Sequence, residues 1–224
     1  MGFDGLLITE IFHSIQGETS LSGKPFVFVR LTGCNLRCSY CDSSYAFKNG
    51  TRMSVDDVVS EAGKFNCKHV LLTGGEPLLQ RKTRDLILAL TSAGHTVSIE
   101  THGEVSIEGV ADLARIVMDI KTPGSLMCRE NFKKNLRFLK PSDEVKFVIA
   151  EPEDYYWARD LIRKTDIPTE EILFSPVTRS PGAPGKFTGV DPLWVAERIL
   201  EDGLDVRLQL QLHKILWGAE KTGV

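Results

Sequence analysis

The sequence predicts an α/β fold, namely an incomplete, open parallel β/α barrel in which residues 1–224 form a single domain. Segments with strand character alternate with segments of helical periodicity along the chain. Repeated strand–helix units give parallel strands that are joined by right-handed crossovers. A complete eight-fold barrel takes about 250 residues. This chain has 224 residues and several long loops, so we expect the barrel to remain open.

The expected strands are short and rich in apolar residues. The first, residues 25–31 (PFVFVRL), is dominated by Phe and Val, which favour strands. Further strands are predicted at residues 69–73, 96–101, 115–121, 144–150 and 171–175, and the alternation over residues 206–212 predicts the last one.

Five helices are expected between these strands, at residues 54–64, 83–93, 131–139 and 153–164, and from residue 191 to about residue 201. Ser54 is a typical N-cap, and Gly94 is placed to end the second helix. Asp191-Pro192 supplies an N-cap and a proline at the first helical position. The Pro/Gly-rich residues 180–189 are expected to form a loop, because one more helix and strand follow them.

Composition excludes several classes of protein. Lys and Arg number 27 against 30 Asp and Glu, which gives a formal charge of −3, and 42% of residues are hydrophobic. These values are ordinary for a globular chain and show no basic footprint for nucleic acid. The longest apolar run, residues 86–90, is far shorter than the about 20 residues of a spanning helix. With no export signal at the start, we expect a cytoplasmic protein without membrane or nucleic-acid partners.

Three cysteines lie close together in one predicted loop. Cys34, Cys38 and Cys41 follow the first barrel strand with the spacing C-x3-C-x2-C. Their thiolates can ligate three irons of a [4Fe–4S] cluster, which leaves the fourth iron open to a small chelating ligand. A structural zinc site would need a fourth ligand from Cys67, His69 or His13, none of which has finger-like spacing. Cys67 and Cys128 are expected to be packing residues, since an odd count argues against a disulfide framework.

Other polar motifs fall at the ends of the predicted strands. In parallel α/β folds the functional site forms at the carboxyl ends of the strands. Those ends carry the cysteine loop, TGGEP at residues 73–77, ETHG at 100–103, DIK at 119–121, Ser175-Pro176, and Gln211 with His213. We therefore expect these residues to meet on one rim.

The motifs resemble those of a known family. CNLRCSYC at residues 34–41 is similar to the CxxxCx-aromatic-C pattern of radical S-adenosylmethionine (SAM) enzymes, and TGGEP is similar to their GGEP segment. EIFHSIQGE at residues 10–18 and RLTGCNL at residues 30–36 resemble the 7-carboxy-7-deazaguanine synthase family. His213-Lys214 and Trp217-Gly218 extend the resemblance to nearly the whole chain.

The resemblance implies a radical SAM fold and a lyase activity. Such an enzyme converts 6-carboxy-5,6,7,8-tetrahydropterin to 7-carboxy-7-deazaguanine with release of ammonia, on the way to 7-deazapurines such as queuosine. It implies three cofactors: a [4Fe–4S] cluster, SAM that is cleaved to a 5′-deoxyadenosyl radical and then regenerated, and Mg²⁺ that holds the substrate carboxylate. It also implies a homodimer and an external reductant such as flavodoxin or ferredoxin.

The resemblance also assigns roles to residues. Cys34, Cys38 and Cys41 are the catalytic cluster ligands, and Ser43 is the Mg²⁺ ligand where the family has threonine. The expected substrate-binding residues are Ile15, Gln16, Gly17, Arg30, Thr73, Gln211 and His213. The expected SAM-binding residues are Tyr40, Cys41, Asp42, Gly75, Glu76, Asp119, Ile120, Lys121, Ser175, Pro176, Val177 and Thr178.

Several of these roles have plainer alternatives. Arg30 lies in an otherwise apolar strand, and its guanidinium matches a carboxylate bidentately, but it could also form a surface ion pair. Ser43 could only cap a turn, and His213 could be a hydrogen-bonded histidine of the rim. The chain departs from the family pattern at Asp119-Ile120, at Ser175 and at His102, where relatives carry Ser-Pro, Gln and Asn.

Other functions remain open at this point. A glycyl-radical-enzyme activase or another small radical SAM enzyme would carry the same cysteine triad. The QGE segment and Arg30 favour a small carboxylated substrate over a protein partner. An iron–sulfur electron carrier would need a fourth thiolate ligand. A zinc-binding structural protein is the last alternative.

Overall fold

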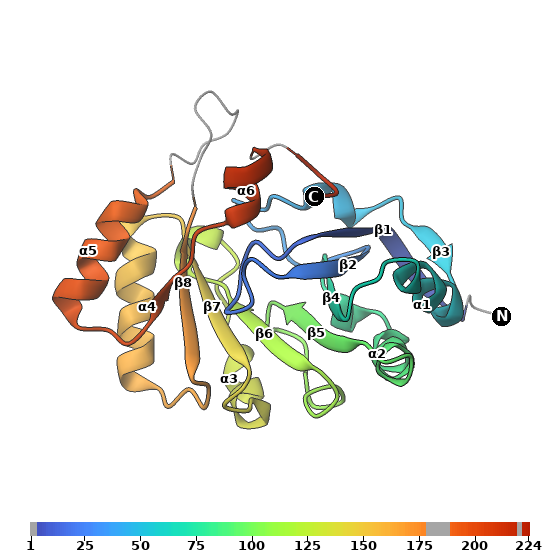
Figure 1. The fold of residues 1–224 in the computed structure, drawn as a ribbon. Coiled ribbons are helices and arrows are strands. Elements are labelled where there is room, and N and C mark those ends of the chain that lie inside the picture. The colour runs from blue at the N-terminus through green and yellow to red at the C-terminus, as the bar shows by residue number, and fades with distance from the viewer. Residues whose placement is uncertain (1–3, 178–188, 219–220) are drawn as a thin grey trace.

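The computed structural model describes residues 4–177, 189–218 and 221–224. Over these residues the strands form one curved sheet in the order β3-β1-β2-β4-β5-β6-β7-β8-β9 (Figure 1). The strands are β1 (Leu6–Ile15), β2 (Pro25–Leu31), β3 (Thr51–Met53), β4 (His69–Gly74), β5 (Thr96–Thr101), β6 (Arg115–Ile120), β7 (Glu144–Ile149), β8 (Glu171–Pro176) and β9 (Arg207–Leu208).

Helices cover the outer side of this sheet, except for α6, which lies over the rim (Figure 1). They are α1 (Val55–Gly63), α2 (Thr83–Ser92), α3 (Phe132–Asn135), α4 (Pro152–Lys164), α5 (Pro192–Asp202) and α6 (Leu212–Trp217), with short 3₁₀ helices at Ser44–Phe47, Pro77–Leu79, Pro123–Ser125 and Leu136–Phe138. Ser54 caps α1 through the amide of Asp57, and Asp191 caps α5 through the amide of Leu193, as the sequence predicts.

The predicted open barrel is confirmed. From β2 to β9 every neighbouring pair of strands is parallel. β3 and β9 stand at opposite edges of the strand order and do not pair with each other, so the sheet curls without closing. The carboxyl ends of the parallel strands consequently share one rim, which carries the cysteine loop.

Two strands at one edge were not predicted. β1 pairs antiparallel with β2, with Phe12 opposite Phe28, and the three-residue β3 pairs antiparallel with β1. The motif that resembles the synthase family therefore lies on a β-hairpin. Its connecting residues 16–24 run from the end of β1 to the start of β2.

Two predicted elements differ from the structure. The helix expected at residues 131–139 is split into α3 and a 3₁₀ turn, where the buried Asn135 donates its side-chain amide to the carbonyls of Gly103 and Val105. The strand expected at residues 206–212 pairs over only Arg207–Leu208. Beyond it, the amide of Leu212 donates to the carbonyl of Gly17 at 2.9 Å, and α6 begins there.

The two faces of the sheet differ in polarity. On β7, Val145, Phe147 and Ile149 pack into the main core against the helices. The alternate residues Lys146 and Val148 face the inside of the barrel and line its cavity. Because strand side chains alternate between faces, one strand supplies both the core and the cavity. A small second core of Phe26, Phe28 and Leu71 fills the β2–β4 side of the interior.

The remaining cysteines behave differently from each other. Cys67 packs against the main core, and its thiol donates to the carbonyl of Pro25 at 3.2 Å, so its expected packing role is confirmed. Cys128 is exposed, so the prediction that it packs is wrong. It lies in the loop that follows the 3₁₀ turn Pro123–Ser125, away from both cores.

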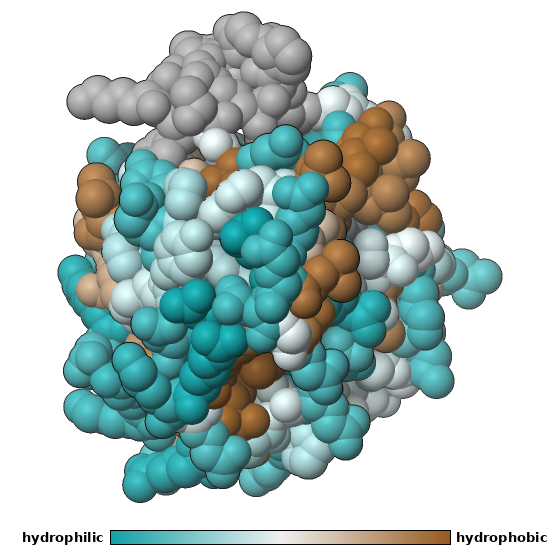
Figure 2. All heavy atoms as spheres, turned by 90° about the vertical axis from the view of Figure 1, so that its left-hand side faces the viewer, coloured by the Kyte–Doolittle hydropathy of each residue, from teal (hydrophilic) through white to brown (hydrophobic). Residues whose placement is uncertain are grey.

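The outer surface is largely hydrophilic on the face that carries α4 and α5 (Figure 2). Figure 2 shows that hydrophilic residues cover most of the face that carries α4 and α5, with hydrophobic residues gathered in smaller areas. Among the described residues, no helix has the length and apolar character that crossing a membrane requires.

Candidate active site

A cavity of about 430 Å³ opens on the rim, where the cysteine loop, the strand ends and α6 meet. Volumes of this size suit small-molecule ligands. Nearly all predicted site residues line it: Ile15, Gln16, Gly17, Arg30, Cys34, Cys38, Tyr40, Cys41, Asp42, Ser43, Thr73, Gly75, Asp119, Lys121, Ser175, Pro176, Val177, Gln211 and His213. Glu76 and Ile120 do not line it, and Thr178 lies outside the described residues.

The cysteine loop is fastened at both ends to neighbouring segments. The amide of Gly33 donates to the carbonyl of Ala46 at 2.8 Å. Further along, the hydroxyl of Ser39 donates to the carbonyl of Gly124 at 2.6 Å, and its amide donates to the carbonyl of Ser125 at 3.0 Å. These contacts join the loop to the turn that follows β6, so the three thiols are held over the carboxyl end of the barrel.

The donor set of the loop fits an iron–sulfur cluster. Burial raises the pKa of the three thiols, and that of Cys38 to about 11. A metal ligates the thiolate, so bound cationic iron would supply the charge compensation that this buried loop lacks. Among the described residues, no three Cys, His, Asp or Glu side chains gather around a point that could hold one metal ion. A cubane cluster does not need such a point, since each thiolate binds a different iron.

Backbone contact between two segments explains the paired glycines of TGGEP. Gly74 has a φ of +128°, and a Cβ there would lie 2.1 Å from the carbonyl oxygen of Leu31. A Cβ on Gly75 would lie 1.9 Å from the carbonyl oxygen of Gly33. Only glycine permits this approach. The pair therefore lets the end of β4 lie directly against the start of the cysteine loop, on the cavity side.

Glu76 follows Gly74 and Gly75 in the chain and is fully buried. Its carboxylate accepts hydrogen bonds from the amides of Leu78 and His102, at 3.0 and 2.9 Å, and from the hydroxyl of Thr101. Burial raises its pKa to about 7. The structure thus places Glu76 as a brace between β4 and β5, and leaves the backbone of Gly74 and Gly75 on the cavity side.

Lys121 and Asp119 form an ion pair on the cavity wall, at the carboxyl end of β6. The Nζ of Lys121 lies 2.9 Å from an oxygen of Asp119 and 5.9 Å from the centre of the Tyr40 ring. Burial opposes the charge of Asp119, but Lys121 and Lys146 outweigh it and lower the pKa of that carboxyl. Ile120 points to the other face of β6 and is buried in the core, because side chains alternate along a strand.

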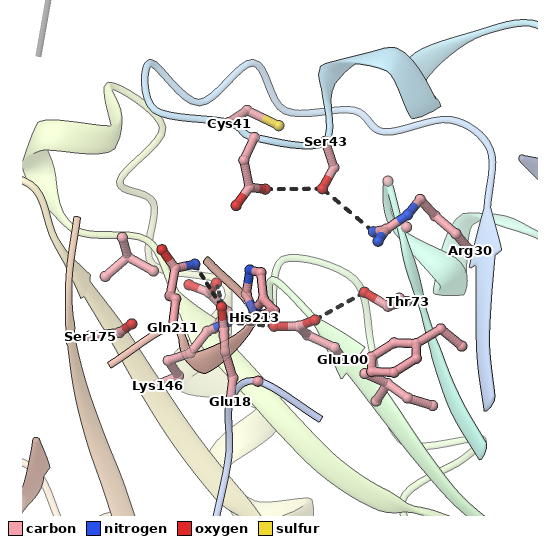
Figure 3. A pocket seen from close by; sticks show the side chains of 18 of the residues that line it. Glu18, Arg30, Cys41, Ser43, Thr73, Glu100, Lys146, Ser175, Gln211 and His213 are labelled. Atoms are coloured by element: carbon pink, nitrogen blue, oxygen red, sulfur yellow. Dashed lines mark hydrogen bonds and ion pairs between the residues drawn. The ribbon is translucent and has the colours of Figure 1, made fainter. Parts of the chain in front are cut away.

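A second polar group surrounds Ser43, just after the last cysteine. The Nη1 of Arg30 lies 3.4 Å from the hydroxyl oxygen of Ser43, which in turn donates to the carboxylate of Asp42 at 3.0 Å (Figure 3). Partial desolvation in the cavity opposes the charge of Asp42, but Lys214 and Ser43 outweigh it and lower the pKa of the carboxyl to about 2. Hydroxyl and carboxylate oxygens are the donors that Mg²⁺ takes, so this corner suits that ion.

The guanidinium of Arg30 is already partly engaged. Its Nε donates to the carboxylate of Glu10 at 2.7 Å, and its Cζ lies 5.7 Å from the centre of the Tyr45 ring. The Nη groups face the cavity corner beside Ser43 (Figure 3). Arg30 is therefore held in place by Glu10 while its outer nitrogens remain directed toward a ligand.

The hairpin connection forms the floor of the cavity near α6. A Cβ on Gly17 would lie 2.1 Å from the ring of His213, so glycine allows α6 to rest on this segment. The side-chain amide of Gln211 donates to Glu18 at 2.7 Å. Burial lowers the pKa of His213. Residues 221–224 also line the cavity.

Three cavity residues received no role from the sequence. Glu18, Glu100 and Lys146 meet inside the barrel, with Lys146 between the two carboxylates (Figure 3). Glu18 and Glu100 lie in motifs that were noted only for their neighbours. Lys146 could have been found from its position, since it is the charged residue in the middle of the apolar strand EVKFVIA.

Comparison with known proteins agrees with this geometry. Residues 28–144, more than half of the chain, match the model of the radical SAM superfamily. The 7-carboxy-7-deazaguanine synthase of Koribacter versatilis is 42% identical over 97% of this chain and 99% of its own length. That of Chlorobaculum tepidum is 40% identical over 98% of this chain and 97% of its own length. The chain belongs to the 7-carboxy-7-deazaguanine synthase family. It is thus a radical SAM enzyme of the lyase class.

Solved structures support the fold of this synthase-family chain. Escherichia coli QueE superimposes with a TM-score of 0.73 over 93% of this chain and 94% of its own, at 22% identity. Streptococcus suis SuiB bound to S-adenosylmethionine gives a TM-score of 0.58 over 80% of this chain and 48% of its own, at 15% identity. Members of this family use a [4Fe–4S] cluster, SAM and Mg²⁺ as cofactors. The three thiols, the backbone of Gly74 and Gly75, and the polar group at Ser43 fit these cofactors.

Proposed function

We propose that this chain converts 6-carboxy-5,6,7,8-tetrahydropterin to 7-carboxy-7-deazaguanine with release of ammonia, in 7-deazapurine biosynthesis. Full-length similarity to the named synthases supports the reaction. The observation that carries it in this chain is the contact of Arg30 with Ser43. It puts a carboxylate-binding cation beside the loop that carries the cysteines, so a carboxylated substrate would be held next to the reacting centre.

In this proposal Cys34, Cys38 and Cys41 hold the cluster. When bound, the cluster and SAM supply the one-electron chemistry that activates the substrate. Gly75, Tyr40 and Lys121 form the walls against which SAM would lie. Ser43, with the neighbouring Asp42, offers oxygen donors to Mg²⁺, and Arg30 balances the charge of the substrate carboxylate.

The other walls of the cavity orient the substrate and exclude water. Ile15, Gln16 and Gly17 from the hairpin line the cavity together with Thr73 from β4. Gln211 and His213 close the side under α6. A ring-contraction enzyme has to keep its reactive species away from solvent, and the strand ends and α6 around the cavity limit the access of water to it.

The expected partners and location belong to the same proposal. The chemistry requires an external one-electron reductant, of the flavodoxin or ferredoxin kind. A homodimer is supported by the exposed side chains of Ile215 and Leu216 on α6, which are 66% and 53% exposed. All five cysteines are free, which fits the reducing cytoplasm.

A turnover assay tests the proposed reaction. The protein is reconstituted anaerobically with iron and sulfide and supplied with reductant, SAM, Mg²⁺ and 6-carboxytetrahydropterin. Mass spectrometry should detect 7-carboxy-7-deazaguanine and equimolar ammonia. A tetrahydropterin without the carboxylate is the matched control, since Arg30 and Ser43 could not hold it. Reductive cleavage of SAM without any deazaguanine product would overturn the proposed substrate and favour another radical SAM reaction.

A further inference from the structure

Lys146 occupies an unusual place for a lysine. It lies in the middle of β7, on the inner face of the barrel, and its side chain is only 5% exposed. Its Nζ lies 2.6 Å from Glu18, 2.5 Å from Glu100 and 3.3 Å from Asp119. These carboxylates come from the hairpin connection, from β5 and from β6. One ammonium group therefore joins three separate parts of the cavity wall.

The charges of this cluster depend on one another. Burial alone would remove the charge of Lys146, but Glu100, Glu18 and Asp119 outweigh it and raise the lysine pKa well above its usual value. Burial likewise opposes the charge of Glu18, and Lys146 outweighs burial so that the pKa of Glu18 is lowered. An uncompensated charge inside a protein is costly, so removing the lysine would leave its carboxylates in mutual repulsion.

Both glutamates are aimed at the cavity by a second contact. The side-chain amide of Gln211 donates to one oxygen of Glu18 at 2.7 Å, and the hydroxyl of Thr73 donates to one oxygen of Glu100 at 2.9 Å. In each glutamate the other oxygen binds Lys146 (Figure 3). The lysine thus completes a chain of contacts from Gln211 through Glu18 and Glu100 to Thr73.

The hairpin connection is anchored to β7 a second time, at the strand's start. The amide and hydroxyl of Ser20 donate to the carboxylate of Glu144, at 3.0 and 2.8 Å. Arg115 lies 2.8 Å from the same carboxylate. Glu144 and Lys146 are two residues apart on one face of β7. Glu144 binds Ser20 and Lys146 binds Glu18, so β7 holds the hairpin connection at two points. Neither Ser20 nor Glu144 lines the cavity, which makes their contact a useful control.

We propose that Lys146 is a positioning residue for the pterin reaction: it fixes Glu18 and Glu100 as a pair of hydrogen-bond acceptors that lie side by side on the wall of the substrate cavity. A pterin carries several N–H donors, which two oriented carboxylates can accept. Lys146 lines the cavity, but its ammonium group is already occupied by three carboxylates, so the lysine is not itself the group that binds the substrate. The inference rests on the proposed function, since it assigns the orientation of that substrate to Lys146.

Lys146→Met is the main test, on the reconstituted full-length enzyme. We expect the KM for the carboxypterin substrate to rise about tenfold or more, which corresponds to the loss of one buried charge-assisted anchor. The dissociation constant of SAM should rise less than about threefold, because Lys121 still pairs with Asp119, and the iron content should stay within about twofold of wild type. Lys146→Arg keeps the charge and should recover most of the lost kcat/KM. Ser20→Ala removes the hydroxyl contact with Glu144 and leaves the contacts of Lys146 intact, so it should change KM less than about threefold.

A second readout does not involve activity. Lys146→Met should lower the melting temperature of the cofactor-free protein by about 5 °C or more, since it leaves buried carboxylates unpaired. Adding Glu18→Gln and Glu100→Gln to that variant should restore most of the loss, because the repelling charges are then gone. The melting temperature should fall when the two glutamine substitutions are made beside an intact Lys146.

The outcomes separate this inference from the proposed function. If wild type makes no deazaguanine product, the proposed function fails, whatever the variants do. If wild type turns over and Lys146→Met keeps its KM and kcat, Lys146 does not position the glutamates for the reaction. An equal loss of SAM affinity and pterin affinity, or a failure of Lys146→Arg to recover activity in a folded protein, would also overturn the inference.

Discussion

The guanidinium of Arg30 and the hydroxyl of Ser43 lie 3.4 Å apart, although the two residues are thirteen positions apart in the chain. Between them runs the whole loop that carries Cys34, Cys38 and Cys41. The contact closes that loop back on the end of β2, the strand from which it starts. A substrate carboxylate bound at this corner would therefore lie at a fixed distance from the cluster, because one short loop sets both positions.

Replacing Arg30 should affect the pterin far more than SAM. For Arg30→Ala we expect the KM for the carboxypterin substrate to rise about thirtyfold or more, since truncating a buried charge partner costs about 2–5 kcal/mol. SAM affinity should change less than about threefold, measured by equilibrium binding under anaerobic conditions. Arg30→Lys should recover only part of the loss, because lysine lacks the bidentate fork. Equal weakening of both ligands would show that Arg30 is structural.

Removing one thiol should remove the cluster but not the fold. Cys38→Ala should reduce bound iron and the visible absorbance of the reconstituted protein to background and abolish turnover. The far-ultraviolet circular dichroism should be unchanged, because the half-buried loop contributes little to the main core. Cys67→Ala is the matched control and should keep full iron content, since Cys67 packs against the core below β2. Full activity of Cys38→Ala without iron would contradict the account.

The corner at Ser43 predicts a specific dependence on magnesium. Ser43→Ala removes one oxygen donor, so the Mg²⁺ concentration for half-maximal activity should rise about tenfold, while activity at saturating Mg²⁺ falls less. Ser43→Thr keeps the hydroxyl and should behave like wild type. Titration of activity with Mg²⁺ after chelation measures both. If Ser43→Ala follows the wild-type curve, Ser43 serves only the turn and its bond to Asp42.

The buried carboxyl of Glu76 predicts how stability varies with pH. Its pKa rises from 4.5 to about 7 on folding, because burial disfavours the charge. Between those values the folded state binds more protons than the unfolded state, so the free energy of unfolding falls as pH rises through this window. The full effect is about 3 kcal/mol. Glu76→Gln cannot titrate, so its melting temperature should fall less than that of wild type between about pH 5 and pH 7.

A buffer series with both proteins measures this difference. Glu76→Gln is expected to be less stable than wild type at the acid end, because its amide places a donor opposite the amides of Leu78 or His102. Only the slope with pH tests the titration. Parallel slopes for the two proteins would mean that Glu76 keeps the same protonation state in the folded and unfolded chain.

Local sequence patterns predicted the parts of this fold that depend on interactions between residues close together in the chain. The cysteine spacing and the glycine pair of TGGEP identify segments that act through backbone geometry and adjacent ligands, and the structure brings both to one cavity. The alternating strands and capped helices were predicted for the same reason, since Ser54 and Asp191 cap the helices that they precede.

Long-range contacts explain what the sequence did not predict. Alternation over residues 206–212 suggests a strand, but the carbonyl of Gly17 binds the amide of Leu212 and α6 starts there. The antiparallel pairing of β1 depends on partners in β2 and β3. Arg30 and Lys146 each interrupt an apolar strand, yet only Arg30 was singled out, because a family resemblance pointed to it. The three carboxylates around Lys146 come from segments that are distant in the chain, so no local sequence pattern predicts their contact with the lysine.

The most direct test of the central claim is the stoichiometry of anaerobic turnover. Reconstituted wild type is given limiting SAM with excess 6-carboxytetrahydropterin, Mg²⁺ and reductant, and product and remaining SAM are quantified together by mass spectrometry. The account predicts many molecules of 7-carboxy-7-deazaguanine per SAM, with SAM recovered, and none from Cys38→Ala. Consumption of SAM to 5′-deoxyadenosine with no deazaguanine from wild type would contradict it.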